Sequence, residues 1–242
     1  MGRDASQGLP LLMVPGLGLG PECWSPTVRA LAGGGPLDRG PAQTVQLPGY
    51  GAPDPGRADL RPEVLARTVV DQLQGGPRVV LLGLSAGCQV AAHVALLAPH
   101  AVAVLVLVGP TTDPRARTWL GLVRRWVSTA RSEPIRQLPV LVRQYRRTGL
   151  ASMARAMDAA RRDRLQDVVP RLSCPVLVLR GSHDRIAPED WLRSLVQRLD
   201  PALDPTTPRR SVTLDAGAHM VSLTHGERVA DAVQGFLADV AD

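Results

Sequence analysis

A serine between two glycines, directly after an apolar run, is the feature of this sequence that most clearly indicates chemistry. The run Val79–Leu84 leads into Ser85-Ala86-Gly87, and a helix-forming segment continues to Leu97. A strand, Gly-x-Ser-x-Gly and a helix in this order predict a sharp, strained turn that exposes the serine hydroxyl. The flanking glycines suit the turn because a side chain there would collide with neighbouring elements. We therefore expect Ser85 to be a nucleophile, with the helix N-terminal amide of Ala86 facing a developing oxyanion.

A neutral serine needs a base, and one of the five histidines is placed to supply it. His219 follows a short apolar run that ends at Leu214. The other four histidines have plainer interpretations: capping or surface roles for His93, His100 and His225, while His183 follows Ser182 in a turn next to the acid candidate. The sequence predicts His219 as the general base.

The base needs a carboxylate that orients it and stabilises its charged form. Asp184 lies in the turn after the apolar run Val176–Leu179 and is the favoured candidate. Asp113, which follows the run at 101–108, is the alternative acid, although an N-cap before Pro114 explains it equally simply. The order Ser85, Asp184, His219 is one of three chain orders in which such a triad is built.

The segments that must position these residues alternate between apolar runs and helical patterns. Continuous apolar runs indicate strands that are covered on both faces, as in a parallel sheet. The predicted fold class is α/β, with a mostly parallel sheet of about six strands and flanking helices. The predicted strands cover residues 9–15, 44–48, 79–84, 101–108, 176–179 and 212–214, and the clearest helices cover 61–73, 86–97 and 227–240.

The long interval between the fourth and fifth predicted strands contains helical patterns and no convincing strand. We interpret residues 111–172 as an inserted helical lid, segmented by its prolines, and residues 1–110 and 173–242 as the core. Apolar residues of the lid are expected to line a hydrophobic pocket over the serine: Trp119, Leu120, Leu122, Trp126 and Val127.

Composition limits the classes of function. The chain has 242 residues, 45% of them hydrophobic, a formal net charge of +6, and arginine at all 28 basic positions. Residues 111–172 hold 14 arginines and five acids, so this segment carries +9 and the remainder about −3. The seven aromatic residues do not form the interleaved platform that a nucleic-acid interface would use. We expect no nucleic-acid partner, and we interpret the arginines as solvated helix faces rather than as a site for anionic substrates.

The cysteines and hydropathy bear on the compartment. Cys23, Cys88 and Cys174 cannot all pair with one another, and their spacing suits no metal site. Cys88, just after the serine turn, is interpreted as a small buried filler and not as a nucleophile. No stretch is long and apolar enough to span a membrane. A cytoplasmic protein without metal or organic cofactor is the simplest expectation.

With these residues in view, the sequence resembles the α/β-hydrolase fold superfamily along nearly its whole length. Residues 14–18, Val-Pro-Gly-Leu-Gly, with Trp24 look like its oxyanion loop, and residues 47–51, Leu-Pro-Gly-Tyr-Gly, look like its Pro-Gly-x-Gly turn. The resemblance implies that the backbone N–H of Leu17 joins that of Ala86 at the oxyanion. Three departures are visible: Pro15 replaces a histidine common in relatives, Gln46 replaces an acid, and the first strand corresponds to the family's third.

The resemblance is strongest to small lidded esterases, lactonases and carbon–carbon bond hydrolases. We expect a serine hydrolase that cleaves a carboxylic ester, lactone or thioester of a small hydrophobic acyl substrate through an acyl-enzyme. Carbon–carbon bond hydrolysis and acyl transfer to another acceptor are alternatives because they can use the same triad. A noncatalytic ligand receptor on the same fold is a further alternative, against which an intact triad argues.

Overall fold

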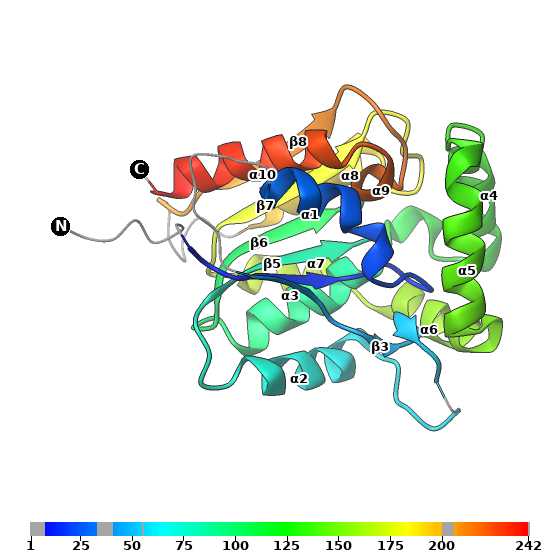
Figure 1. Ribbon diagram of the computed structural model, residues 1–242, viewed down its shortest axis with the longest axis horizontal. Coiled ribbons are helices and arrows are strands. Elements are labelled where there is room, and N and C mark those ends of the chain that lie inside the picture. The colour runs from blue at the N-terminus through cyan, green and yellow to red at the C-terminus, as the bar shows by residue number, and fades with distance from the viewer. Residues whose placement is uncertain (1–7, 33–40, 55, 200–205, 242) are drawn as a thin grey trace.

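A six-stranded, all-parallel sheet forms the centre of the molecule (Figure 1). The computed structural model describes residues 8–32, 41–54, 56–199 and 206–241. The strands lie in the order β2-β1-β5-β6-β7-β8. Their bounds are β1 Leu11–Val14, β2 Ala42–Thr44, β5 Val79–Leu84, β6 Val102–Val108, β7 Val176–Gly181 and β8 Arg209–Leu214. The α/β class and the six-stranded sheet predicted from the sequence are confirmed.

The central strands are buried on both faces because helices cover the sheet above and below. Every residue of β1, β5, β6 and β7 is buried, which explains the continuous apolar runs in these strands; Arg180, near the end of β7, is the exception in residue type. One hydrophobic cluster joins the sheet to α2 (Pro62–Leu73), α3 (Gly87–Leu97) and α8 (Glu189–Arg198). A second cluster joins it to α1 (Ser25–Ala32), α9 (Val221–Thr224) and α10 (Gly226–Ala241).

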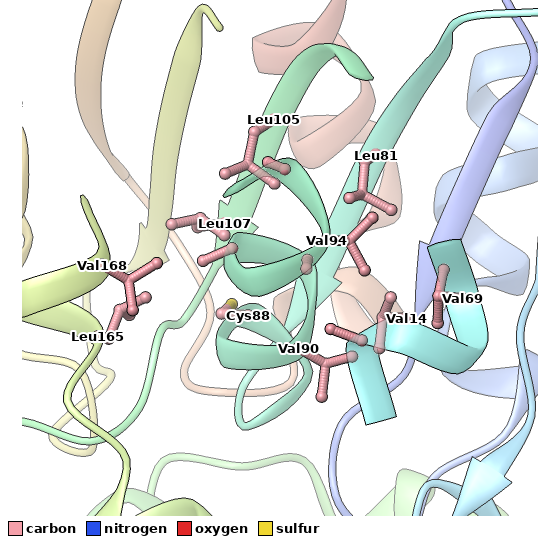
Figure 2. Packing of buried hydrophobic residues seen from close by; sticks show 14 of the residues in the cluster. Val14, Val69, Leu81, Cys88, Val90, Val94, Leu105, Leu107, Leu165 and Val168 are labelled. Atoms are coloured by element: carbon pink, nitrogen blue, oxygen red, sulfur yellow. The ribbon is translucent and has the colours of Figure 1, made fainter. Parts of the chain in front are cut away.

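The helix α3, which follows the serine turn, is packed into the first of these clusters (Figure 2). Val94 of α3 lies near Leu81 of the sheet, and Val90, one turn earlier, lies near Val14 and Val69. Nine of its eleven residues are buried, so the helix is anchored along most of its length. Its N-terminus is therefore held in a fixed position at the carboxyl end of β5.

The second predicted strand needs correction. The apolar run at 44–48 was expected to be one strand, but the sheet strand β2 ends at Thr44. Residues Leu47–Pro48 form β3, which pairs with β4 (Gly51–Ala52) in a separate two-stranded sheet. Gly49, with φ of +81°, turns the chain between them. Glycine accommodates this left-handed conformation without the steric cost that a side chain would add.

A helical insertion, α4–α7, lies between β6 and β7, as the sequence predicts and consistent with a lid. Figure 1 shows α4 and α5 beyond the arrowheads of β5 and β6, on the side of the molecule opposite the termini. The helices are α4 Trp119–Ala130, α5 Leu138–Thr148, α6 Leu150–Arg162 and α7 Leu165–Val168, with 3₁₀ turns at Pro114–Ala116, Ile135–Gln137 and Val169–Arg171. The division into a core and a lid at residues 110 and 173 stays a prediction, and residues 1–7, 33–40, 55, 200–205 and 242 of the expected core lie outside the described residues.

Within the described part of the chain, no helix has the length and apolar character needed to cross a membrane.

Candidate active site

Ser85 occupies a strained turn between β5 and α3. Its φ of +55° makes it the only residue other than glycine with a positive φ among those described. The Ser85 amide donates a 2.8 Å hydrogen bond to the carbonyl of Val108, which ties the turn to the neighbouring strand. A non-glycine residue in this conformation costs roughly 1–3 kcal/mol and persists only where its surroundings enforce it.

The two glycines beside the serine are required by close backbone packing. A Cβ built on Gly83 would lie 2.7 Å from the Cα of Cys88, and one built on Gly87 would lie 2.3 Å from the carbonyl oxygen of Pro15. Both distances are much shorter than a van der Waals contact, and the atoms that the added Cβ atoms would meet belong to the backbone, which cannot easily move away. The Gly-x-Ser-x-Gly spacing therefore has the steric cause inferred from the sequence.

Three predicted residues, far apart in the chain, are brought together in a hydrogen-bonded line. Nε2 of His219 lies 2.8 Å from Oγ of Ser85, and Nδ1 of the same ring lies 2.8 Å from Oδ2 of Asp184. A neutral imidazole whose Nδ1–H donates to the carboxylate leaves Nε2 as an acceptor for the serine proton. The arrangement can thus accept a proton from Ser85 while Asp184 fixes the ring.

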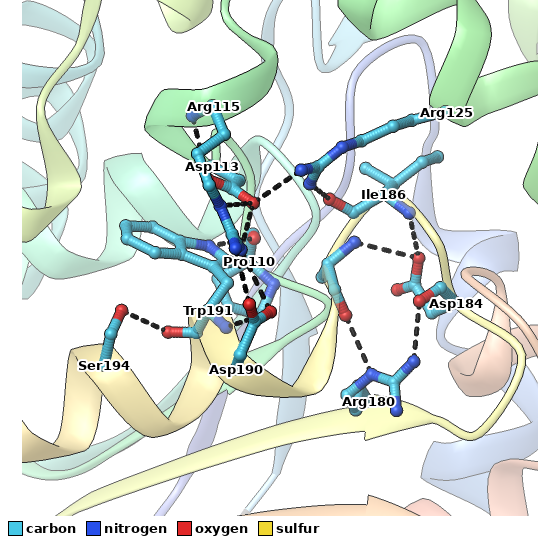
Figure 3. Close-up of polar contacts among 11 residues, drawn as sticks. Pro110, Asp113, Arg115, Arg125, Arg180, Asp184, Ile186, Asp190, Trp191 and Ser194 are labelled. Carbon is cyan, nitrogen blue, oxygen red and sulfur yellow. Dashed lines mark hydrogen bonds and ion pairs between the residues drawn. The ribbon is translucent and has the colours of Figure 1, made fainter.

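Asp184 is held by its own turn. Its second carboxylate oxygen, Oδ1, accepts hydrogen bonds from the amides of Ile186 at 2.8 Å and Ala187 at 3.0 Å. The buried guanidinium of Arg180 donates to the carbonyls of Asp184 at 2.6 Å and Ala187 at 2.8 Å, as Figure 3 shows. These contacts leave Oδ2 free to face His219.

Gly109, at the end of β6, makes room for the histidine–aspartate pair. Its φ is +57°, and an added Cβ would lie 3.1 Å from Nδ1 of His219 and 3.2 Å from Oδ2 of Asp184. Gly109 is not among the residues predicted from the sequence. Its position directly after a predicted strand, next to the Pro110 that begins the loop, was the signal that could have found it.

Two carboxylates, those of Asp184 and Glu133, influence the pKa of His219. Burial of the ring disfavours the imidazolium, but the carboxylate of Asp184, by its charge and its hydrogen bond, and the charge of Glu133 outweigh this effect and raise the pKa of His219 above its ordinary value. Glu133 belongs to the helical insertion, and its Oε1 accepts a 2.8 Å hydrogen bond from the amide of Met220. Sequence reasoning missed Glu133 because nothing local marks it as a neighbour of residue 219.

The two amides expected at the oxyanion are available. Among the described residues, the backbone N–H groups of Leu17 and Ala86 have no hydrogen-bond acceptor. The loop that carries Leu17 runs beside the serine: a Cβ built on Gly16 would lie 3.3 Å from the Cβ of Ser85. Leu17 and Ser85 line the same cavity.

The loop of Leu17 is fixed from two sides. The amide of Gly18 donates to the carbonyl of Gly49 at 2.8 Å, so the Pro-Gly-x-Gly turn braces it from the core. From α5, Gln144 accepts a 2.6 Å hydrogen bond from the amide of Gly20, and the hydroxyl of Thr148 donates to the carbonyl of Gly18 at 3.1 Å. Gln144 and Thr148 were not predicted, since only the packing of the insertion onto the core reveals them.

A cavity of about 410 Å³ opens at Ser85 and His219, between the core and the insertion. Its walls are mostly apolar, and three of the five predicted lid residues, Trp119, Leu122 and Trp126, line it. Leu120 and Val127 do not line it and are exposed instead. The correction follows from helical geometry, because positions 119, 122, 123 and 126 share one face of α4 and positions 120 and 127 lie beside it.

Asp113, the alternative acid, lies apart from the histidine. Its side chain accepts from the amide of Arg115 at 2.9 Å, which is the N-cap interaction suggested by the sequence, and it forms ion pairs with Arg115 and Arg125 (Figure 3). Burial favours the neutral acid, but hydrogen bonds from Arg115 and Arg125 hold the pKa of Asp113 below its usual range. Among the described residues, the hydrogen bonds and ion pairs of the Asp113 side chain are with Arg115 and Arg125, whereas Asp184 binds His219.

Cys88 and His93, two further residues interpreted from the sequence, both lie inside the protein. Cys88 is fully buried, with its thiol directed at the carbonyls of Gly83 and Val108, and burial raises the pKa of the thiol well above its ordinary value. Its position agrees with the filler interpretation. His93 is not a surface residue: its Nε2 lies 2.8 Å from Oδ1 of Asp163, so it links α3 to the insertion.

The fold and these residues define a class of protein. Residues 11–232 match the alpha/beta hydrolase family, and the chain belongs to that family.

Particular relatives lie within the same class. The chain is 26% identical over 222 residues to the pimeloyl-[acyl-carrier protein] methyl ester esterase of Xanthomonas axonopodis pv. citri (strain 306), with 81% of this chain and 84% of the relative covered. It is also 26% identical over 267 residues to the protein of the same name from Vibrio campbellii (strain ATCC BAA-1116), with 98% and 97% covered. Among solved structures, the enol-lactonase from Burkholderia xenovorans LB400 superposes with a TM-score of 0.72 at 20% identity, covering 98% of this chain and 94% of that one.

Proposed function

We propose that this protein is a serine hydrolase that cleaves a carboxylic ester through an acyl-enzyme, with Ser85, His219 and Asp184 as its triad. The observation that carries the proposal is the pair of 2.8 Å hydrogen bonds that join Ser85, His219 and Asp184 at the floor of an apolar cavity. Membership of the alpha/beta hydrolase family supports hydrolysis in general, and relatives named as esterases support the ester bond.

In the first half of the reaction, Oγ of Ser85 attacks the ester carbonyl and transfers its proton to Nε2 of His219. The carbonyl oxygen becomes an oxyanion that the N–H groups of Leu17 and Ala86 stabilise, a contribution of about 3 kcal/mol for each donor. Asp184 stabilises the imidazolium. The tetrahedral adduct then expels the alcohol, which takes the proton from His219, and Ser85 is left acylated.

In the second half, a water molecule attacks the acyl carbonyl while Nε2 of His219 accepts its proton. Collapse of the second tetrahedral adduct releases the carboxylic acid, and the proton returns to Ser85. Every proton of the cycle passes through His219, and the net change is addition of one water across the ester bond.

The cavity indicates the kind of acyl group. Its volume of about 410 Å³ and its tryptophan, leucine and methionine walls suit a hydrophobic chain of several carbons. The relatives named pimeloyl-[acyl-carrier protein] methyl ester esterase support a medium-length acyl ester as the substrate class to test first.

A fluorophosphonate probe tests the proposal directly, because it labels a serine only when the serine is activated. We expect labelling of the wild type and none of Ser85→Ala, together with turnover of chromogenic medium-chain esters. Labelling without turnover of any ester would favour carbon–carbon bond hydrolysis or acyl transfer. Absence of Ser85-dependent labelling would overturn the enzyme proposal itself.

A further inference from the structure

The exposed hydrophobic side chains of this protein are concentrated on one part of its surface. Among the described residues, all but one of the large hydrophobic side chains that are exposed lie between residues 119 and 150, in the helical insertion. Leu120 and Ile135 are each 80% exposed and Leu150 is 75% exposed. Single exposed hydrophobic residues are common, but a contiguous group marks a surface that binds something.

The same surface is strongly basic. Residues 119–148 contain seven arginines and one acid, Glu133, whose carboxylate is engaged by the amide of Met220 and the side chain of Gln137. Five of the seven arginines are exposed and have no ion-pair partner in the described chain: Arg124, Arg131, Arg136, Arg143 and Arg146. The arginines that follow in α6 are instead paired with acids, as Arg155 is with Asp54 and Arg161 with Asp158.

Apolar and basic residues alternate along one side of α4, and both kinds of side chain can contact the surface of an anionic bilayer. Positions 120, 124, 127 and 131 fall on one helical face and read Leu, Arg, Val, Arg. On such a face the aliphatic side chains can enter the acyl region of an anionic membrane, because the long arginine side chains can extend past them to the lipid phosphates. Exposed tryptophans such as Trp119 and Trp126 favour the same depth.

The mouth of the cavity lies in this surface. Trp119, Val123, Trp126, Ile135 and Leu138 line the cavity that contains Ser85, and each is also exposed to solvent. In Figure 1, α4 and α5 form the outermost layer on this side of the molecule. A surface bound through α4 and α5 would therefore lie against the entrance through which an acyl chain reaches the serine.

We propose that the face formed by α4, the turn at Ile135–Gln137 and α5, here called the docking face, binds an anionic lipid surface, from which the hydrolase takes lipid-dissolved acyl esters. The choice of these substrates rests on the proposed hydrolase function; the binding itself does not need Ser85. A second copy of the chain is a poorer occupant because two docking faces would place unpaired arginines against unpaired arginines.

Vesicle sedimentation tests the binding. We expect the wild-type protein and Ser85→Ala to sediment with vesicles of equal parts phosphatidylglycerol and phosphatidylcholine, and to remain in solution with pure phosphatidylcholine. Added salt should weaken the binding, since it screens the arginines from the lipid phosphates. Binding by Ser85→Ala separates this proposal from the catalytic one, because a failure of fluorophosphonate labelling would leave the vesicle result intact.

Matched variants assign the binding to the docking face. Arg136→Glu with Arg143→Glu should weaken vesicle binding by at least about 25-fold, since each basic side chain near an anionic surface contributes roughly fivefold. The control pair Arg29→Glu with Arg198→Glu changes the net charge equally on α1 and α8 and should weaken binding far less. Leu120→Glu should also reduce binding, whereas Leu97→Glu should not; Leu97 is the one exposed large hydrophobic residue outside the insertion in the described part of the chain.

Arg29, Arg136, Arg143, Arg198, Leu97 and Leu120 do not line the cavity. Their variants should therefore hydrolyse a short-chain, water-soluble ester at the wild-type rate, which also shows that they are folded. Two results would overturn the proposal: no binding to either vesicle, as expected if an acidic protein occupies the face, or equal losses in the docking-face and control pairs.

Discussion

The carboxylate of Glu133 accepts a 2.8 Å hydrogen bond from the backbone N–H of Met220, the residue that follows His219. Its other oxygen accepts a 2.8 Å hydrogen bond from Gln137 at the start of α5. One side chain of the insertion thus reaches the loop of His219 and lies in the wall of the cavity. The charge of the same carboxylate raises the pKa of His219, so the insertion contributes to the charge environment of the histidine.

Replacing Glu133 by glutamine should shift the pH dependence of the reaction. The negative charge of Glu133 raises the pKa of His219, and the base must be neutral to accept a proton, so activity in the wild type should rise only above the ordinary histidine pKa. Glu133→Gln keeps an acceptor for Met220 but removes the charge. We expect the acidic limb of kcat/KM to move to lower pH with the plateau retained, measured with a medium-chain ester.

Glu63→Gln provides the control for this shift. Glu63 lies on α2, where it pairs with Arg67, and its loss changes the net charge by the same amount. An acidic limb that stays in place in Glu133→Gln, or that moves equally in Glu63→Gln, would contradict the coupling.

Two aspartates should separate catalysis from stability. Asp184→Asn should lower kcat by about 10⁴-fold while the fold persists, since the amide no longer selects the correct tautomer of His219. Asp113→Asn should leave kcat near the wild-type value and lower the free energy of unfolding by about 1–3 kcal/mol, because Asp113 anchors Arg115 and Arg125. Steady-state kinetics and urea unfolding measure the two effects, and the reverse pattern would make Asp113 the catalytic acid.

Gly109→Ala should impair the histidine–aspartate pair. The new Cβ would lie 3.1 Å from Nδ1 of His219 and 3.2 Å from Oδ2 of Asp184, so one of these groups must move. A displacement of this kind costs on the order of 10²-fold in rate when it disturbs catalytic geometry. We expect kcat to fall while KM changes little.

Gly75→Ala is the matched control. Gly75 also has a positive φ, +72°, but no atom lies within 4 Å of its added Cβ. Both substitutions place alanine in the left-handed region, which costs roughly 1–2 kcal/mol. This strain should therefore lower the free energy of unfolding of the two variants by similar amounts. Equal losses of kcat in the two variants would show that strain, and not contact with His219, is responsible.

The length of the acyl chain should be limited by the wall of α4. Leu122 lines the cavity and Leu120 does not. Leu122→Trp should reduce kcat/KM for long-chain esters much more than for acetate, by about fourfold for each methylene that can no longer be buried. Leu120→Trp enlarges an exposed position of the same helix and should leave the chain-length profile unchanged. A profile unaffected by Leu122→Trp would place the acyl chain elsewhere.

The central strands and the serine turn could be read from the sequence because their causes are local. Continuous apolar runs specify β5 and β6, and glycines at 83 and 87 specify the turn at Ser85. Residues 44–48 were predicted less well, because a short run with alternating exposure at the sheet edge does not say where pairing stops. In the structure the sheet strand ends at Thr44, and the contact between Gly49 and Gly18 lies beyond it.

Contacts between the insertion and the core could not be predicted. Glu133 meets Met220 across 87 positions and Gln144 meets Gly20 across 124, with no motif at either end. Helical periodicity shows that a helix has an apolar face, but it does not show what that face covers. Leu120 and Val127 were therefore assigned to the cavity although they lie outside it.

The sequence by itself determined the α/β order of elements and the side chains available at Ser85, Asp184 and His219. It could do so because the burial of each strand and the steric limits of each turn depend on residues that are close together in the chain. Only the tertiary structure decided that Asp184 and not Asp113 faces His219, and that Glu133 of the insertion binds the backbone N–H of the next residue, Met220. These outcomes depend on where separately specified helices and turns pack in space, and that packing is fixed by the whole assembled core rather than by any one segment of the chain.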